Sequence, residues 1–346
     1  MWSRRILGAG GALLGSVLLV KEEKPTWRVE YPKLLNENGE RLSRKVINEQ
    51  DKTNLGLRLY QYQSCPYCCK VRAMLDYYGF SYEIIEVNPI TKKEMKKLGT
   101  SYNKVPVLSS RQTESPLVES SLIVSVLETF LTLPKRKLEE CINFYPVIEG
   151  TNPENGKPQL VYPNKYFIMA EDAIKSQEQL QSAREEREWR EWIDEHFIHV
   201  ISPLVYRTWA DALDTFRCFS KTGNWEELFS SWERYLAIYM GAMAMFVISK
   251  RLKKRHNIED EKQAMLDALN KWISGKGPSR KFMGGNEPNL ADLSLYGAIN
   301  SFVGCRAFQE VREQTNIGEW YDAVHQAVIQ KQGRSKVAAK SAALAT

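Results

Sequence analysis

The chain has 346 residues, of which 43% are hydrophobic and 26% charged, so it can form ordinary folded cores and does not have the composition of a disordered protein. This length predicts two domains. Lysine and arginine total 48 against 42 acidic residues, and the small net charge of +6 is spread along the chain, which argues against a nucleic-acid-binding protein. The 6 cysteines are too few for a disulfide-stabilised secreted scaffold and suit a reducing compartment.

Residues 6–20 form an uncharged, apolar segment flanked by basic residues. The segment is shorter than the roughly 20 residues that span a bilayer, so a short single-pass anchor, a signal peptide and an organelle-targeting segment all remain open. Basic residues are denser after it than before it, which places the body of the protein in the cytosol by the positive-inside rule. We therefore expect residues 1–24 to be a membrane anchor or leader, with a soluble cytosolic form if the leader is removed. Residues 25–54 are expected to be an extension.

Residues 55–132 alternate between apolar strands and amphipathic helices in the order βαβ, then α, ββ, α. The elements expected are a strand over 57–62, a helix over 66–78, a strand over 82–87, a charged helix over 91–99, strands at 105–108 and 116–118, and a helix over 120–130. This order predicts a thioredoxin/glutaredoxin-like domain.

Residues 133–164 are rich in proline and glycine and are predicted to be a linker. Residues 165–330 have helical periodicity throughout, so we predict an all-α second domain and a fold class of α/β plus all-α. Within it, the uncharged segment 236–249 is expected to be a helix buried in the core, ended by a basic run that complements its carboxyl end. Residues 331–346 are small and alanine-rich and are expected to be a flexible tail.

The sequence Cys65-Pro66-Tyr67-Cys68 falls where a predicted strand passes into a helix. Proline is favoured at the first helical position, so Cys65 is expected at the positive end of the helix dipole, beside backbone N–H groups that have no intrahelical partner. Those groups stabilise thiolate over thiol, which predicts a pKa for Cys65 below that of a free cysteine. Cys68 lies one turn later and is expected to face the helix side more than solvent.

Other interpretations of the cysteines and histidines are less favoured. A zinc site would need a second pair of ligands at a suitable spacing, which the sequence lacks, and Cys65 as an inert core thiol conflicts with its position at a surface turn. We expect the remaining cysteines to be small buried apolar residues: Cys69, Cys141, Cys218 and Cys305. His196 and His199 share one helix face, but packing or solvation explains them better than a metal, and we predict no metal site.

Two further motifs complete a candidate pocket. A proline opens the strand at Val105-Pro106, which fits a cis bond that leaves the backbone of Val105 to pair with the cysteinyl backbone of glutathione, as in thioredoxin-like folds. Ser120, after Glu119, is expected to cap the next helix, whose free N–H groups suit a γ-glutamyl carboxylate.

The segments YQYQSCPYCCKVRAMLDYYG, EIIEVNPI, SYNKVPVL and KFMGGNEPNLADLSLYG resemble the membrane-associated prostaglandin E synthase type 2 family. The resemblance extends from about Pro32 to near Gln330 and implies a glutaredoxin-type domain followed by a glutathione-transferase-like helical domain. It implies conversion of prostaglandin H2 to prostaglandin E2, with Cys65 as the catalytic thiol, Cys68 as its partner and Tyr62 in the same pocket. The glutathione-binding residues that it implies are Val105, Pro106, Glu119 and Ser120.

The same resemblance implies haem held jointly by glutathione and Cys65, and a Golgi membrane location, while the glutathione-transferase-like architecture suggests a homodimer. Two departures are an insertion-like stretch at residues 95–100 and the additional thiol of Cys69. Two other functions remain open at this point. One is a glutathione-dependent thiol–disulfide oxidoreductase, because the motif suits disulfide exchange. The other is a glutathione- and haem-binding protein without isomerase turnover.

Overall fold

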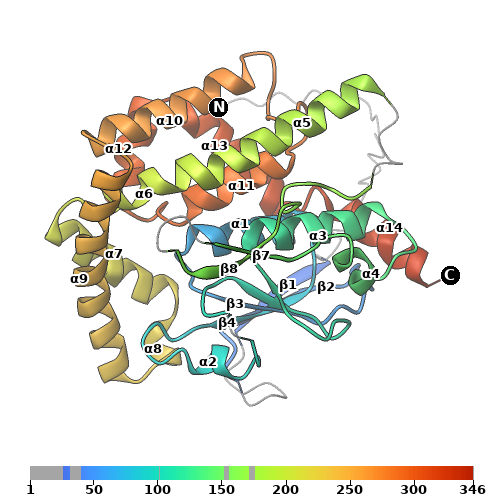
Figure 1. The fold of residues 1–346 in the computed structure, drawn as a ribbon, viewed down its shortest axis with the longest axis horizontal. Helices are drawn as coiled ribbons and strands as arrows, with labels where there is room; N and C mark the ends of the chain where they lie inside the picture. The colour runs from blue at the N-terminus through green and yellow to red at the C-terminus, as the bar shows by residue number, and fades with distance from the viewer. Residues whose placement is uncertain (1–25, 32–39, 101, 152–155, 171–175, 346) are drawn as a thin grey trace, which may run out of the picture.

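The computed structural model describes residues 26–31, 40–100, 102–151, 156–170 and 176–345 (Figure 1). Its main sheet has six strands in the order β1-β2-β4-β3-β5-β6. The strands are β1 (Trp27–Glu30), β2 (Arg44–Asn48), β3 (Leu57–Gln61), β4 (Tyr82–Glu86), β5 (Val107–Ser109) and β6 (Leu117–Val118). Strands β3 and β4 pair in parallel and are connected by α1 (Pro66–Tyr78), whereas the other neighbouring pairs in this sheet are antiparallel.

The alternation of side chains along β3 gives the sheet two covered faces. Leu57 and Leu59 belong to the core that includes α1 and α3 (Ser120–Thr132), whereas Tyr60 packs with Met95 of α2 (Lys93–Lys96) in a smaller cluster. Figure 1 shows α1 and α3 on one side of the sheet and α2 on the other. The predicted thioredoxin-like arrangement is therefore confirmed.

Two segments contain more structure than their sequence suggested. The extension over residues 25–54 carries β1 and β2, and β2 pairs with β4, so the extension widens the sheet. The predicted linker over residues 133–164 contains α4 (Leu138–Ile142) and a hairpin of β7 (Ile148–Thr151) and β8 (Pro158–Val161). Proline and glycine mark the turns between these short elements, and they obscure the elements themselves.

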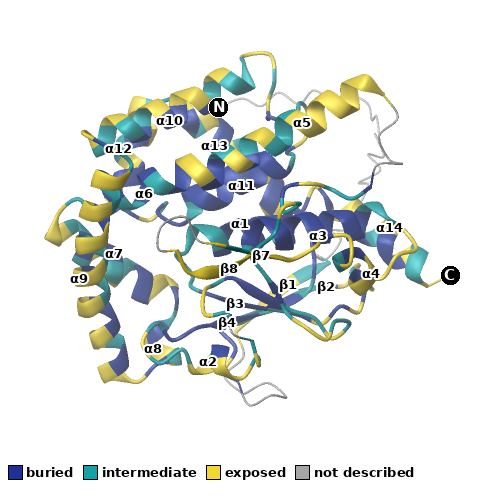
Figure 2. Ribbon diagram, viewed as in Figure 1, coloured by how far each residue is buried: buried dark blue, intermediate teal, exposed yellow. Residues whose placement is uncertain are grey.

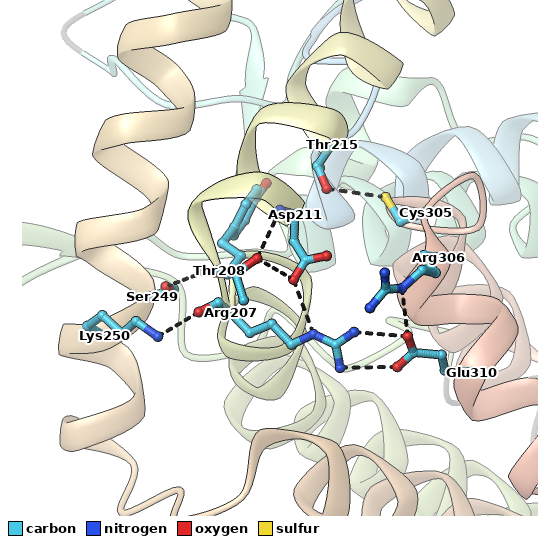
Figure 3. A network of polar contacts seen from close by, with 10 residues as sticks. Arg207, Thr208, Asp211, Thr215, Ser249, Lys250, Cys305, Arg306 and Glu310 are labelled. Atoms are coloured by element: carbon cyan, nitrogen blue, oxygen red, sulfur yellow. Dashed lines mark hydrogen bonds and ion pairs between the residues drawn. The ribbon is translucent and has the colours of Figure 1, made fainter.

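The second domain is helical, as predicted. It comprises α5 (Gln177–Trp192), the π-helical turn η2 (Ile193–Phe197), α6 (Ile198–Val205), α7 (Trp209–Thr222), α8 (Trp225–Leu228), α9 (Ser231–Arg255), α10 (Glu261–Lys276), α11 (Leu290–Asn300), α12 (Arg306–Gln314) and α13 (Ile317–Ile329). Asn289 caps α11 and the Asp292 carboxylate accepts a hydrogen bond from the N–H of Asn289 at 3.1 Å. Figure 3 shows Arg207 between α6 and α7, where its guanidinium pairs with Glu310 of α12 and with Asp211 of α7.

The expectation that residues 236–249 form a buried core helix is wrong. Helix α9 buries Ala237, Ile238, Ala242 and Ser249, but its opposite face exposes large apolar side chains (Figure 2). An uncharged run shows that a helix is apolar, but it does not show whether another element covers it. Among the described helices, α9 is long and apolar enough to cross a membrane, by length and composition alone.

The prediction of a flexible tail over residues 331–346 is also wrong. Residues Arg334–Leu344 form α14, which buries Val337, Lys340 and Ser341. The ammonium of Lys340 donates hydrogen bonds to the carbonyls of Leu133 and Pro134, at 2.6 and 3.1 Å, just beyond the carboxyl end of α3. Alanine-rich sequence favours a helix, and this helix is stabilised by docking on the first domain.

The two domains meet most closely where α11 crosses α1. At Gly297 of α11, an added Cβ would lie 2.6 Å from both the N and the Cα of Lys70 and 2.7 Å from the carbonyl oxygen of Cys69. These are backbone atoms, so they cannot move aside as the end of a flexible side chain can. A side chain at position 297 would therefore force the two helices apart.

Replacing Gly297 with alanine should lower the free energy of unfolding by about 2 kcal/mol or more, because overpacking in a core commonly costs about 1–3 kcal/mol. Gly318 of α13 is the matched control, since its added Cβ would meet only the flexible side chain of Arg312 at 3.4 Å or beyond. Gly318→Ala should be neutral or stabilising by up to about 1 kcal/mol. Urea unfolding of both variants provides the measurement, and equal effects would show that the α1–α11 contact does not constrain the fold.

Candidate active site

The turn between β3 and α1 presents Cys65 at the start of the helix. The N–H of Cys65 donates to the carbonyl of Tyr62 at 3.0 Å, and Cys65 itself is the N-cap, with extended backbone angles (φ −75°, ψ 124°). Pro66 occupies the first turn of the helix, as predicted, and the carbonyl of Cys65 accepts the N–H of Cys69 at 2.9 Å. Cys65 is a partly exposed residue, and as the N-cap it lies at the positive end of α1.

The surroundings of Cys65 favour its thiolate. A hydrogen bond from the thiol of Cys68 makes the largest contribution to lowering the pKa of Cys65. The backbone N–H groups of Cys68 and Tyr67 and the charge of Arg72 lower it further, and together they outweigh burial, which raises it. Burial and the hydrogen bond to Cys65 raise the pKa of Cys68, which is buried. Cys68 therefore stays protonated and acts as the donor, and the direction predicted for Cys65 from the motif agrees with this geometry.

The neighbouring thiol of Cys69 does not compete with Cys65. Cys69 is buried, and burial raises its pKa to about 11, so it is protonated at neutral pH. The guanidinium of Arg72 donates to the Cys69 sulfur at 3.0 Å and to the carbonyl of Gln63 at 2.8 Å. Cys69 thus helps to hold Arg72, whose charge in turn favours the thiolate of Cys65.

Several tyrosines surround the thiol and remain protonated. Burial and the negative charge of Cys65 raise the pKa of Tyr62, and burial likewise raises that of Tyr67. Tyr62 and Tyr102 pack against the same small cluster as Val105, on the α2 side of the sheet. Burial raises the pKa of Tyr102, and the charges of Glu119 and Cys65 raise it further. The sequence did not suggest Tyr102 as a residue of this site, and its packing beside Tyr62 and Val105 is what brings it there.

The strand register brings the three predicted motifs to one end of the sheet. Tyr60 pairs with Val107, and Val107 pairs with Val118. Because β5 is antiparallel to both β3 and β6, the residues after Gln61, before Val107 and after Val118 all leave the sheet at the same end. The Val105–Pro106 peptide bond is cis, as predicted.

The start of α3 differs from the expectation in one detail. The N-cap is Glu119, not Ser120: its backbone has a positive φ of 69°, and its carboxylate accepts the N–H of Leu122 at 2.9 Å. Ser120 is instead the first helical residue, and its hydroxyl is buried without a hydrogen-bond partner among the described residues. A buried unpaired hydroxyl beside free helix N–H groups is a feature that a bound anionic ligand would satisfy.

A buried ionic cluster joins this end of α3 to the second domain. Asp194, in the π-helical turn, pairs with Lys70 of α1 and accepts the Ser121 hydroxyl at 2.5 Å and the Tyr166 hydroxyl at 3.2 Å. Burial alone would raise the pKa of Asp194, but the Lys70 ammonium lowers it. Burial raises the pKa of Glu119, and the charge of Lys165 opposes this shift.

Sequence reasoning missed Tyr162, Lys165 and Asp194. Tyr162 and Lys165 follow β8, where the predicted linker gives way to the predicted helical domain. Burial raises the pKa of Tyr162, and the charge of Glu119 raises it further. Asp194 lies in a π-helical turn, a distortion that often occurs at functional sites but has no sequence pattern.

The remaining cysteines and histidines lie outside this site. Cys141 and Cys305 are buried, whereas Cys218 is partly exposed, contrary to expectation. The rings of His199 and His256 stack at 4.4 Å, and His196 stacks on Trp192. Over the described part of the chain, no group of three His, Cys, Asp or Glu side chains is placed to hold a metal ion.

A thioredoxin-like sheet with a cysteine at the start of its first helix, followed by a helical domain, defines a glutathione-transferase-like protein. In agreement, the family model described as "Glutathione S-transferase, N-terminal domain" matches residues 59–130. The chain is 41% identical over 278 residues to prostaglandin E synthase 2 of Danio rerio, covering 80% of this chain and 72% of that protein. It is 38% identical over 333 residues to prostaglandin E synthase 2 of Mus musculus, covering 94% and 82%. The chain therefore belongs to the prostaglandin E synthase 2 family.

Among solved structures, glutathione transferase F7 from Populus trichocarpa has 15% sequence identity to this chain and a TM-score of 0.45. That comparison covers 80% of this chain and 99% of the other. The resemblance to the family found in the sequence is thus confirmed by the curated relatives.

Replacing Cys68 with alanine should raise the pKa of Cys65, because the substitution removes the thiol that donates to the thiolate. Cys68→Ser keeps a donor and is the matched control. Below the pKa of a free cysteine, the alanine variant should lose about tenfold in alkylation rate at Cys65 for each unit of rise, whereas the serine variant should stay near wild type. The rate can be followed from pH 5 to 9 by mass spectrometry of the peptide that contains Cys65. A free cysteine, with a pKa of about 8.5, is the reference. Equal profiles for the two variants would contradict the role of this hydrogen bond.

Proposed function

We propose that this protein isomerises prostaglandin H2 to prostaglandin E2, with the Cys65 thiolate as nucleophile and glutathione bound beside it. The observation that carries the proposal is that Cys65, a partly exposed residue at the start of α1, has a lowered pKa. Membership of a family whose curated relatives are named prostaglandin E synthase 2 supports the substrate.

The proposed reaction uses the weak O–O bond of the endoperoxide. The Cys65 thiolate attacks the oxygen on C9, so an S–O bond forms while the O–O bond breaks, and the oxygen on C11 leaves and takes a proton to become a hydroxyl. Loss of the C9 hydrogen as a proton then forms the ketone, breaks the S–O bond and returns the thiolate. The overall change is redox-neutral, as an isomerisation requires.

Tyr62 is the proposed hydrogen-bond donor to the departing oxygen. Burial, together with the charge of Cys65, raises its pKa and keeps the phenol protonated at neutral pH. The backbone N–H of Cys65 donates to the carbonyl of Tyr62 at 3.0 Å, so the two residues are neighbours in the turn. A preorganised donor beside a developing oxyanion stabilises the transition state without reorganisation.

The residues at the end of the sheet fit glutathione. The unpaired hydroxyl of Ser120 and the N–H groups at the start of α3 would receive the γ-glutamyl carboxylate, and the Glu119 carboxylate would receive the neighbouring ammonium. Val105 and Pro106 leave the sheet at the same end and would hold the cysteinyl part. When bound, glutathione supplies a second thiol beside Cys65. No described feature of the site points to haem, and no step is assigned to it.

The hydrogen bond between the thiols of Cys65 and Cys68 supports a second candidate function, a glutathione-dependent thiol–disulfide oxidoreductase. Two thiols this close can be oxidised to a disulfide and reduced again. The oxidoreductase reaction consumes both sulfurs in each cycle, whereas the isomerase reaction needs only Cys65, and this difference separates the two functions.

The predicted membrane anchor over residues 1–24 lies outside the described residues and stays a prediction. The same holds for the Golgi location, the cytosolic orientation and the homodimer. An anchored enzyme would be suited to a substrate derived from membrane lipid.

The proposed isomerase is tested by incubating prostaglandin H2 and glutathione with wild type, Cys65→Ser and Cys68→Ser protein at equal haem content. Cys65→Ser should reduce enzyme-dependent prostaglandin E2 formation by at least about 10³-fold, the scale seen when a catalytic nucleophile is removed. Cys68→Ser should keep most of the activity because its hydroxyl still donates. Equal yields from all three proteins would refute the proposal. If wild type reduces a mixed disulfide of glutathione and both variants lose this activity, the oxidoreductase is favoured.

Glutathione binding at α3 is tested with Ser120→Ala. Loss of a hydrogen bond to a charged carboxylate should weaken glutathione binding about tenfold or more, since such bonds contribute about 1.5–3 kcal/mol. Ser274→Ala on α10, at an exposed position, is the matched control and should bind as wild type. Isothermal titration calorimetry measures both, and unchanged affinity in Ser120→Ala would remove Ser120 from the proposed site.

A further inference from the structure

Helix α9 presents a continuous apolar face to the outside of the molecule. The exposed side chains recur every three or four residues along the helix, so they share one side of it. We call them the α9 apolar face: Trp232, Tyr235, Leu236, Tyr239, Met240, Met243 and Val247, each between 40% and 62% exposed. Figure 2 shows α9 at the edge of the molecule with exposed residues along its length. A patch of this kind is unusual on a protein surface unless something binds to it.

The opposite side of α9 holds the helix firmly, so the apolar face cannot turn inward. Gly241 lies so close to α7 that an added Cβ would be 2.3 Å from the ring of Phe216. At the carboxyl end, the Ser249 hydroxyl and the Lys250 ammonium donate to the carbonyls of Tyr206 and Arg207, at 3.2 and 2.7 Å (Figure 3). The face is therefore a fixed surface of the folded protein.

The charged residues in the carboxyl-terminal part of α9 are basic. Residues 235–255 contain no aspartate or glutamate, and the three- and four-residue spacing of the face continues from Val247 to the exposed Arg251 and Lys254. An apolar surface with aromatic side chains and a basic end has the properties of a helix that lies in the interface of an anionic bilayer. Apolar side chains would enter the boundary between headgroups and acyl chains, and the cations would meet lipid phosphates.

A second copy of the chain fits this surface less well. Two copies joined through the face would have to neutralise the basic ends with acidic groups. At the amino-terminal end of α9, however, Glu226 already pairs with Arg234 at 3.0 Å, and Glu233 accepts from Ser230 and Asn88. A transmembrane span also does not fit, because α6 and α7 cover the other side of α9.

We propose that the α9 apolar face is a docking surface for a bilayer that contains anionic phospholipid. The contact is separate from any attachment through residues 6–20 and does not depend on the proposed enzymatic activity. It would lay the helical domain on the membrane, with α9 parallel to the surface.

Trp232 provides a local test on the full chain. Vesicles of phosphatidylcholine and phosphatidylserine with brominated acyl chains should quench the fluorescence of wild type more than that of Trp232→Phe, and the difference should shrink with phosphatidylcholine alone. Attachment elsewhere in the chain quenches both proteins alike and cancels in the difference. Equal quenching of the two proteins while they are bound to vesicles would overturn the proposal.

A second pair of variants tests the energetic contribution of the face. Met240→Glu combined with Met243→Glu should lower the lipid affinity, measured from Trp232 quenching against lipid concentration, by at least about tenfold. Two apolar groups that would enter the bilayer are lost, and two negative charges are added. Ile329→Glu, at a 44% exposed position on α13, is the matched control and should behave as wild type. Sedimentation velocity without lipid completes the test: a wild-type dimer that becomes monomeric in the Met240/Met243 variant would show that the face binds a second copy instead.

Discussion

The contact of α1 with α11 at Gly297 sets the position of the Cys65 turn relative to the second domain. Helix α1 begins at the sulfur, touches α11 through backbone atoms, and carries Lys70 into the buried ion pair with Asp194. The same helix therefore provides the dipole that favours the thiolate and the contact that orients the helical domain. A change in the packing of α1 would move the thiol, the tyrosines beside it and the start of α3 together.

The features of the site that could be predicted from the sequence are those that depend on local chemistry. Proline is favoured in the first turn of a helix, so Pro66 indicated the helix start and the position of Cys65 just before it. The register of short antiparallel strands then brings the motifs at Val105 and Glu119 to the same end of the sheet. These relations involve residues that are neighbours in the sequence or in one sheet, so the order of residue types is enough to predict them.

The features that could not be predicted depend on contacts between distant segments. Ser120 is a better capping residue than glutamate, yet the positive φ at Glu119 lets its carboxylate reach Leu122 and leaves the Ser120 hydroxyl unpaired. Lys165 and Tyr162 reach the site only because the β7–β8 hairpin precedes them. Helix α9 has the composition of a core helix, but within the described part of the chain no element covers its outer side, and no local pattern distinguishes these cases.

The docking of α14 has a consequence for synthesis of the chain. Lys340 is fully buried, and its ammonium serves carbonyl groups that follow α3, while the N–H of Gly333 donates to Tyr77 at the end of α1. The first domain is translated long before residues 333–344 leave the ribosome, so it emerges with these surfaces uncovered. Its packing is complete only when residues 333–344 have followed and have docked on the carboxyl ends of α1 and α3.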